Sequence, residues 1–364
     1  MRKVQIKLKH LNYPIYIGSG IISEMGKLLN STNKNEKIVI VTDKIVARKY
    51  LNSLKNNLNK YGFNNILTIE IGIGEKEKSL LRADSIYTDL IKNKVSRNSV
   101  IMSLGGGVVG DLSGFVASTY LRGVKFAQIP TTLLAQVDSA IGGKVGVNHN
   151  LGKNLIGSFY HPQFVLCDTE FLKSLPKREI ICGLAEIIKY GIIKDKKIFN
   201  FIEINLNDIL AQKINLDEII YSSVKIKSQV VEKDERENNL RAILNCGHTI
   251  GHALEKCGNY KYWKHGEAIL LGLAGEAFIA KELKMLAENE FKVITSLIKK
   301  IPIPKISKLK IKNNSLLEVM SRDKKVKDSK IRFALPLAVG KVSMPFGVEV
   351  EQIIKSLNYL KNNF

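Results

Sequence analysis

Hydrophobic and polar residues follow two different rhythms along the chain, and the change between them falls near Pro176. Before it, short apolar runs alternate with amphipathic stretches of helical period. This alternation is typical of a parallel sheet flanked by helices. Strands are predicted at 37–43, 64–71 and 99–107, with helices from 44 to about 61 and from 79 to 94 between them, and MRKVQIKLKH at the start alternates like a further strand.

After Pro176 the segments are longer and amphipathic, which predicts a mostly helical part. The clearest are 178–195, 216–234 and 268–283, followed by an extended stretch at 331–346 and a last helix at 350–360. We therefore expect two domains: an α/β domain of Rossmann type over 1–173, and a mostly α-helical domain over 174–364.

Composition places the chain among ordinary globular proteins, with 45% hydrophobic residues and a mean hydropathy of −0.02. No apolar run approaches the ~20 residues that a bilayer crossing needs, and the N-terminus lacks a signal-peptide core. Four cysteines (Cys167, Cys182, Cys246, Cys257) form no CxxC pair, which favours a reducing compartment. We expect a cytoplasmic protein.

The formal net charge of +22 raises the question of nucleic-acid binding. The lysines are scattered among asparagine and isoleucine, as in NSLKNNLNKYGFNN, and no basic run is interleaved with stacking aromatic residues. A coding bias towards AT-rich codons explains the charge better, so neither a nucleic acid nor a membrane is expected as a partner. An anionic small substrate remains compatible with it.

A glycine-rich turn follows the strand at 99–107. Gly105, Gly107 and Gly110 satisfy G-x-G-x-x-G between a strand and a helix, where glycine lets the backbone approach a pyrophosphate. The acidic residue that usually follows about 20 positions later is missing, and Asp43, at the end of an earlier strand, is a candidate for its role. The segment 130–157 adds two threonines, an aspartate and two lysines that each follow glycine, a combination that favours ligand binding over a structural turn.

Two histidines, His248 and His252, are spaced four apart in NCGHTIGHAL and lie on one face of a helix. A carboxylate on an apolar helical segment, Glu186, and the HGEA sequence at His265 and Glu267 supply further donors. Nitrogen and oxygen donors without cysteine suit catalytic zinc or cobalt. From spacing alone, the predicted ligands are His248, His252 and one carboxylate.

The ordered series GGGVVGDLSGFVAS, YLRGVKFAQIPTTLLAQVDSAIGGKVGVNH, GKNLIGSFYHP, GLAEIIKYG, LNCGHTIGHALE and HGEA resembles the 3-dehydroquinate synthases. The resemblance covers roughly residues 43–347. Sugar-phosphate cyclases such as 2-deoxy-scyllo-inosose synthase share the fold and metal ligands, and glycerol and iron-dependent alcohol dehydrogenases are more distant. Departures are small: Cys246 replaces a commoner aromatic residue, and VGV follows Lys144 in place of Thr-Ala-Val.

The resemblance implies a lyase of the shikimate pathway, which leads to the aromatic amino acids. Such enzymes convert 3-deoxy-D-arabino-heptulosonate 7-phosphate to 3-dehydroquinate and phosphate. Bound NAD⁺ transiently oxidises a hydroxyl, phosphate is eliminated, NADH returns the hydride, the ring opens and an aldol step closes the carbocycle. NAD and a divalent zinc or cobalt ion are the implied cofactors.

The resemblance also assigns residues. The implied metal ligands are Glu186, His248 and His265, with His252 facing the substrate, in contrast to the prediction from spacing. The YLRG turn reaches an adjacent subunit's site in the family, which implies a homodimer. The implied catalytic and substrate-binding positions are Arg122, Asp138, Lys144, Asn154, Lys189, Lys227, Arg241, Asn245, His252 and Lys324. The implied NAD positions are Asp43, Glu75, Lys78, Gly106, Gly107, Val108, Asp111, Thr131, Thr132, Asp138, Ser139, Lys144 and Lys153.

Two rival enzymes remain open from the residues themselves: a cyclase that acts on a different sugar phosphate, and a simple polyol dehydrogenase. Lys227, Arg241, Lys153 and Asn154 together favour a substrate with both a carboxylate and a phosphate. The sequence GEKEKS leaves open which of its two lysines serves the cofactor, and Glu75 and Lys78 are the least certain of the implied positions.

Overall fold

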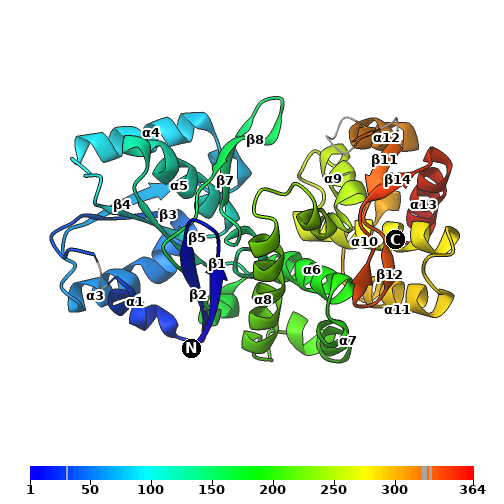
Figure 1. Ribbon diagram of the computed structural model, residues 1–364, viewed down its shortest axis with the longest axis horizontal. Coiled ribbons are helices and arrows are strands. Elements are labelled where there is room, and N and C mark those ends of the chain that lie inside the picture. Colours follow the sequence, from blue (N-terminus) through cyan, green and yellow to red (C-terminus); the bar gives the residue numbers. More distant parts are fainter. Residues whose placement is uncertain (30–31, 322–325, 328–329) are drawn as a thin grey trace. The chain divides into compact units, whose positions relative to one another are not determined.

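The computed structural model describes residues 1–29, 32–321, 326–327 and 330–364 (Figure 1). Its internal contacts divide the chain into two compact units. Unit 1 comprises Met1–Leu175 and Asn215–Glu232, and unit 2 comprises Pro176–Ile214 and Lys233–Phe364. Lys324, which the resemblance assigns to phosphate binding, lies outside the described residues.

Unit 1 is built on a seven-stranded sheet that is parallel except at one edge, where β1 and β2 pair antiparallel. The predicted α/β character of the first half is confirmed. In spatial order the strands are β1 (Arg2–Lys7), β2 (Asn12–Gly18), β9 (Val165–Asp168), β6 (Lys125–Pro130), β5 (Val100–Gly105), β3 (Ile38–Asp43) and β4 (Ile66–Ile71).

Both faces of this sheet are covered by helices, because alternate residues of each strand point to opposite sides. In β3, Val39 and Val41 join the core cluster under α4 and α5, whereas Ile38 and Ile40 join the cluster under α1 and α3. The helical elements of unit 1, besides α8, are η1 (Ile21–Glu24), α1 (Met25–Leu28), α2 (Lys44–Val46), the π-helix η2 (Ala47–Leu51), α3 (Asn52–Lys60), η3 (Glu75–Glu77), α4 (Leu80–Lys92), α5 (Gly107–Thr119), η4 (Tyr120–Arg122), the π-helix η5 (Ala135–Ser139) and η6 (Thr169–Ser174).

The order of the strands places a topological switch between β3 and β5. The chain leaves β3 towards β4 on one side, and it leaves β5 towards β6 on the other. Thr42 and Leu104 are register partners, so Asp43 and Gly105 end neighbouring strands at the same edge. Ligands of doubly wound folds bind at this kind of crevice.

Two further elements complete unit 1. The antiparallel hairpin of β7 (Lys144–His149) and β8 (Gly152–Phe159) packs its first strand against α5. Helix α8 (Asp217–Lys233) is attached through Asp217, which accepts a hydrogen bond from Thr169 at 2.6 Å. The predicted boundary at 173/174 puts this helix in the second domain, but its contacts lie in unit 1. Periodicity shows that a helix has an apolar face without showing what covers that face.

Unit 2 is mostly helical, as the sequence predicts, and α10 lies at its centre, packed against α6, α9, α11 and α13. The predicted extended stretch at 331–346 forms short strands. The elements of unit 2 are α6 (Lys177–Ile193), α7 (Lys196–Leu210), η7 (Leu240–Asn245), α9 (His248–Cys257), α10 (His265–Glu282), α11 (Glu288–Lys299), η8 (Ile306–Lys308), α12 (Asn313–Ser321), β10 (Val326–Lys327), β11 (Lys330–Phe333), β12 (Pro336–Ala338), β13 (Lys341–Val342), β14 (Phe346–Val348) and α13 (Val350–Asn363).

None of the helices in the described part of the chain combines the length and the hydrophobicity that crossing a membrane requires.

Candidate active-site residues

The glycine turn connects β5 directly to α5, so the first amide groups of a 13-residue helix border the sheet edge. A side chain at Gly105 would meet Val109 at 2.5 Å, and one at Gly107 would meet the Ser139 hydroxyl at 3.0 Å. That hydroxyl is buried and forms no hydrogen bond with any described residue. A helix N-terminus with a bare backbone and an unsatisfied donor beside it suits an anionic group such as a pyrophosphate.

Other predicted NAD positions border the same turn. Asp43 accepts hydrogen bonds from the amides of Ile45 and Val46 at 2.9 and 3.0 Å, and it thereby caps α2. Thr131, at the end of the neighbouring strand, donates its amide to the carbonyl of Gly105 at 3.0 Å. The structure therefore brings together residues that are about 90 positions apart in the sequence.

Lys78 connects the glycine helix to the β7–β8 hairpin. Its ammonium group contacts the carboxylate of Asp111 on α5 and the side-chain oxygen of Asn154 on β8. Lys78 is buried whereas Lys76 is exposed, so Lys78 is the lysine of GEKEKS that faces these groups. Burial raises the pKa of Asp111, and the neighbouring Lys78 opposes that shift.

The neighbouring positions Glu75 and Lys153 lie 3.8 Å apart as an ion pair, and Glu75 also accepts a hydrogen bond from Asn148 at 2.8 Å. Lys144 is exposed at the start of β7. Arg122 is also exposed, on a turn where both Leu121 and Arg122 have positive φ, at 49° and 63°. Such backbone angles are unusual for residues other than glycine and occur often at functional sites.

Asp138 lies in the π-helix η5, a rare type of helix that frequently occurs at functional sites. Helix α8 brings Lys227 to it, with the ammonium group 2.6 Å from the carboxylate and 2.7 Å from the backbone oxygen of Asp138. Lys227 is almost fully buried. Unit 1 therefore holds a charged pair made from two residues that the resemblance assigns to substrate binding.

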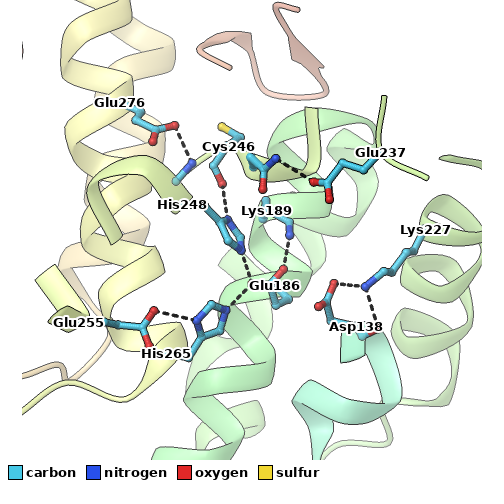
Figure 2. A network of polar contacts seen from close by, with 12 residues as sticks. Asp138, Glu186, Lys189, Lys227, Glu237, Cys246, His248, Glu255, His265 and Glu276 are labelled. Atoms are coloured by element: carbon cyan, nitrogen blue, oxygen red, sulfur yellow. Dashed lines mark hydrogen bonds and ion pairs between the residues drawn. The ribbon is translucent and has the colours of Figure 1, made fainter. Parts of the chain in front are cut away.

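In unit 2, helices α6, α9 and α10 bring together three potential metal ligands, one carboxylate and two imidazoles. Oε1 of Glu186 lies 3.6 Å from Nε2 of His248 and 3.4 Å from Nε2 of His265. Figure 2 shows both rings directed at this carboxylate. One ligand atom from each residue lies within 4.8 Å of the others.

These residues fit a divalent metal ion. Oε1 of Glu186 is completely buried and forms no hydrogen bond with a described residue. Bonds of ~2.1 Å in a tetrahedral arrangement separate ligand atoms by about 3.4 Å, which is close to the observed spacing. Burial alone raises the pKa of the Glu186 carboxyl, but the Lys189 ammonium and the His265 ring outweigh burial and hold that pKa well below its usual range. The carboxylate is therefore kept as an anion, as a cation site requires.

His252 takes a different position from the one that spacing predicts. The three-donor group around Glu186 contains His265 in its place, and exposed His252 is grouped with Glu255 and His265. An i, i+4 pair can divide its roles because the two rings project from successive turns of α9. The sequence pattern is the same for both arrangements, so spacing alone could not separate them.

Arg241 and Asn245 lie on the short helix η7 that precedes α9. Arg241 is buried, its guanidinium donates to the carbonyl of Glu235 at 2.5 Å, and its amide donates to Asp234 at 2.8 Å. Asn245 donates to the carboxylate of Glu237 at 3.1 Å. Glu237 is therefore a partner of a predicted substrate-binding residue, and nothing in the sequence pattern indicates it.

Three more buried carboxylates lie on the helices α9 and α10 that carry the two histidines. Glu267, a candidate donor in the sequence, instead pairs with Arg178 and caps its own helix α10. Glu276 accepts the amide of Gly247 at 2.6 Å, immediately before His248 (Figure 2). Glu255 accepts a hydrogen bond from Nδ1 of His265 at 3.1 Å. It follows His248 by seven residues and so lies on the same face of α9, a spacing that is visible in the sequence.

Comparison with known proteins identifies the family. Residues 68–182 match the family described as 3-dehydroquinate synthase N-terminal, and residues 183–326 match 3-dehydroquinate synthase C-terminal. The 3-dehydroquinate synthase of Thermodesulfovibrio yellowstonii is 43% identical over 98% of this chain and 100% of that protein.

Solved structures show the same fold. A 2-deoxy-scyllo-inosose synthase complexed with carbaglucose-6-phosphate, NAD⁺ and Co²⁺ superposes with a TM-score of 0.86 at 25% identity, over 100% of both chains. The 2-epi-5-epi-valiolone synthase ValA of Streptomyces hygroscopicus, with NAD⁺ and Zn²⁺ bound, gives 0.87 at 23% identity over 98% of this chain and 99% of that chain. Given the 43% identity along nearly its whole length, the chain belongs to the 3-dehydroquinate synthase family.

Proposed function

We propose that the residues described above carry out the reaction of the 3-dehydroquinate synthases. The chain is an enzyme that converts 3-deoxy-D-arabino-heptulosonate 7-phosphate to 3-dehydroquinate and phosphate, the second step of the shikimate pathway. Its cofactors are NAD and a divalent metal ion, Co²⁺ or Zn²⁺. The observation that carries the proposal is the convergence of Glu186, His248 and His265 on one point.

Each cofactor has its own group of residues. Glu186, His248 and His265 hold the metal ion, and the turn of Gly106 and Gly107 with its neighbours holds NAD. When bound, NAD⁺ accepts and later returns a hydride while the metal ion polarises a substrate hydroxyl, so the reaction has no net redox change. Nucleotide binding belongs to the proposed domain 1–173 and metal binding to 174–364.

Charged side chains bind the two anionic ends of the substrate. The backbone amide of Arg241 donates to Asp234, which fixes the main chain at this position. The Arg241 guanidinium presents a planar set of donors that suits the carboxylate of the substrate. The phosphate is bound by cationic and amide side chains, those of Arg122, Lys144, Asn154, Asn245 and His252. Positive charge around a phosphate dianion favours its departure, because that charge stabilises the released anion.

Lys189 and Asp138 serve the hydroxyl groups. Lys189 is buried and contacts Oε2 of Glu186, so its ammonium group is held against one side of the metal-binding carboxylate. The Lys227 ammonium holds the Asp138 carboxylate at 2.6 Å, and that carboxylate can accept a hydrogen bond from a substrate hydroxyl.

The active assembly is a homodimer in the cytoplasm. The exposed Arg122 turn, whose two positive φ angles are unusual for leucine and arginine, supports a role in reaching a second copy of the chain. All four cysteines belong to the described residues and are free thiols, as a reducing compartment favours.

A phosphate-release assay on the purified protein tests the reaction. With the heptulosonate phosphate, we expect release that stops with a chelator and resumes with added Co²⁺ or Zn²⁺, and that depends on NAD⁺. Release from glucose 6-phosphate instead would identify a different cyclase, and accumulation of NADH at the nicotinamide absorbance band would identify a dehydrogenase. Either result would overturn the proposal.

A set of single substitutions tests the metal ligands. His248→Ala and His265→Ala should purify with much less than one metal ion per chain. His252→Ala is the matched control, since it removes an imidazole from the same helix as His248: it should retain the metal and lose phosphate release. Metal content by elemental analysis, combined with activity, separates the two roles. Loss of metal in the His252 variant would restore the prediction from spacing.

A further inference from the structure

A buried carboxylate that no step above uses faces the ring of His265. Oε2 of Glu255 lies 3.1 Å from Nδ1 of His265, and the Glu255 side chain is 8% exposed. The opposite nitrogen of the ring, Nε2, is the one that faces Glu186 at 3.4 Å. Figure 2 shows the ring between the two carboxylates, with one contact on each side.

The two nitrogens of an imidazole are not equivalent. The nitrogen that donates a hydrogen bond carries the proton, and the other then presents a lone pair to a metal. A carboxylate on Nδ1 keeps the proton there and also fixes the direction of the ring. A proton kept on Nδ1 by Glu255 leaves the lone pair on Nε2, the nitrogen that faces Glu186.

His248 is oriented by a different type of acceptor. Its Nδ1 lies 3.2 Å from the backbone carbonyl of Cys246, which is part of the segment leading into α9. Glu255 is seven residues after His248 on that helix, and α9 packs closely against α10, which begins with His265. Helix α9 thus contributes one ring of the cluster and the acceptor that orients another.

We propose that Glu255 is a positioning residue of the metal site: its carboxylate holds His265 in the tautomer and orientation that direct Nε2 towards Glu186. The proposal rests on the assignment of His265 as a ligand. It adds a residue that contacts neither the metal nor the substrate in the scheme above.

One alternative follows from the same atoms. His252, Glu255 and His265 also form a group whose ligand atoms lie within 4.8 Å of one another. A second cation there would use Nδ1 of His265 and would require the proton on that nitrogen to leave. The contact of 3.1 Å between Nδ1 and Glu255 has the length of a hydrogen bond, and it favours the orienting role.

The experiment measures Co²⁺ binding to the metal-free, full-length protein by competition with a chromophoric chelator. Glu255→Ala should weaken binding by about 10- to 100-fold, the usual effect of removing an outer-shell partner. Glu255→Gln keeps an acceptor oxygen and should recover most of the affinity. The visible absorption of bound Co²⁺, which reports ligand geometry, should change in the alanine variant and much less in the glutamine variant.

Glu77→Gln is the matched control, because Glu77 is also a buried, paired glutamate, 2.7 Å from Arg82, and contributes no atom to the metal cluster. It should leave Co²⁺ affinity unchanged. Unchanged affinity and an unchanged spectrum in Glu255→Ala would overturn the proposal, as would two Co²⁺ ions per wild-type chain falling to one in that variant. Because the readout is metal binding, it stands whether or not the protein releases phosphate from the heptulosonate.

Discussion

The ammonium group of Lys227 lies 2.6 Å from the carboxylate of Asp138 and 2.7 Å from its backbone oxygen, although 89 residues separate the two. Helix α8 makes this contact possible because its contacts place it in unit 1, the unit that also holds Asp138. A lysine that binds the side chain and the main chain of one residue fixes both. The local shape of the π-helix around Asp138 is therefore coupled to the position of α8.

Lys227→Met should impair both catalysis and stability. It removes the partner of Asp138, and loss of a hydrogen bond to a charged group costs about 1.5–3 kcal/mol of unfolding free energy. The kcat/KM for the heptulosonate phosphate should fall by roughly 100-fold or more, since Asp138 loses the partner that holds its carboxylate in place. Lys225→Met is the control, because Lys225 is exposed on the same helix. Equal kinetics in the two variants would contradict the role of Lys227.

The sequence predicts the elements well and their partners poorly. Periodicity identifies the helix at 216–234, but the apolar face of that helix does not say that unit 1 receives it. Likewise, G-x-G-x-x-G marks a turn, whereas the neighbouring position of Asp43 depends on strand order, which is set by packing over the whole sheet. Local pattern is a property of neighbours in the chain, and strand order is not.

The same limit applies to the metal cluster. His248 and His252 satisfy the helical spacing equally, and only the placement of α6 and α10 groups His248 with Glu186 and His265. The family resemblance supplied that choice in advance, because it carries three-dimensional information that spacing lacks. Glu276 and Glu237 gave no signal in the sequence, since their contacts are with distant or irregular segments.

The two lysines of GEKEKS are expected to differ in NAD binding. Lys78→Met should raise the dissociation constant of NAD⁺ about tenfold or more, which corresponds to ~1.4 kcal/mol, because Asp111 and Asn154 both lose a shared partner. Lys76→Met replaces an exposed lysine two residues away and should leave the dissociation constant of NAD⁺ within about twofold of the wild-type value. Calorimetric titration with NAD⁺ compares them, and a larger effect at Lys76 would reverse the assignment.

The close approach of α9 and α10 depends on Gly272. A Cβ there would lie 1.9 Å from the carbonyl oxygen of Gly247, the residue before His248. Alanine gains up to ~1 kcal/mol of helix propensity, but a contact with rigid backbone forces the helices apart and costs more. Gly272→Ala should therefore lower the midpoint of thermal unfolding and weaken Co²⁺ binding.

Gly152→Ala provides the comparison for that change, because its Cβ would meet the flexible end of Leu155 at 3.0 Å. Gly152→Ala should leave the midpoint of thermal unfolding and the Co²⁺ affinity nearly unchanged. If Gly272→Ala binds Co²⁺ as tightly as the wild type does, the packing of α9 on α10 does not set the position of His248.

The last prediction concerns pH and the segment that carries Arg241. Burial acts to raise the pKa of Asp234, but the amides of Arg241, Asn238 and Asn239 donate to its carboxylate and outweigh burial, so its pKa is lowered in the folded protein. A group whose folded pKa is lowered stabilises the fold fully above its unfolded pKa, about 3.9, and loses that contribution as the pH falls through the folded value. Because Asp234 is partly exposed, we expect a contribution of about 1 kcal/mol. The difference in unfolding free energy between the wild type and Asp234→Asn should be constant from pH 5 to 7 and shrink below about pH 4. A difference that persists unchanged at pH 3 would show that the carboxylate charge does not hold this segment.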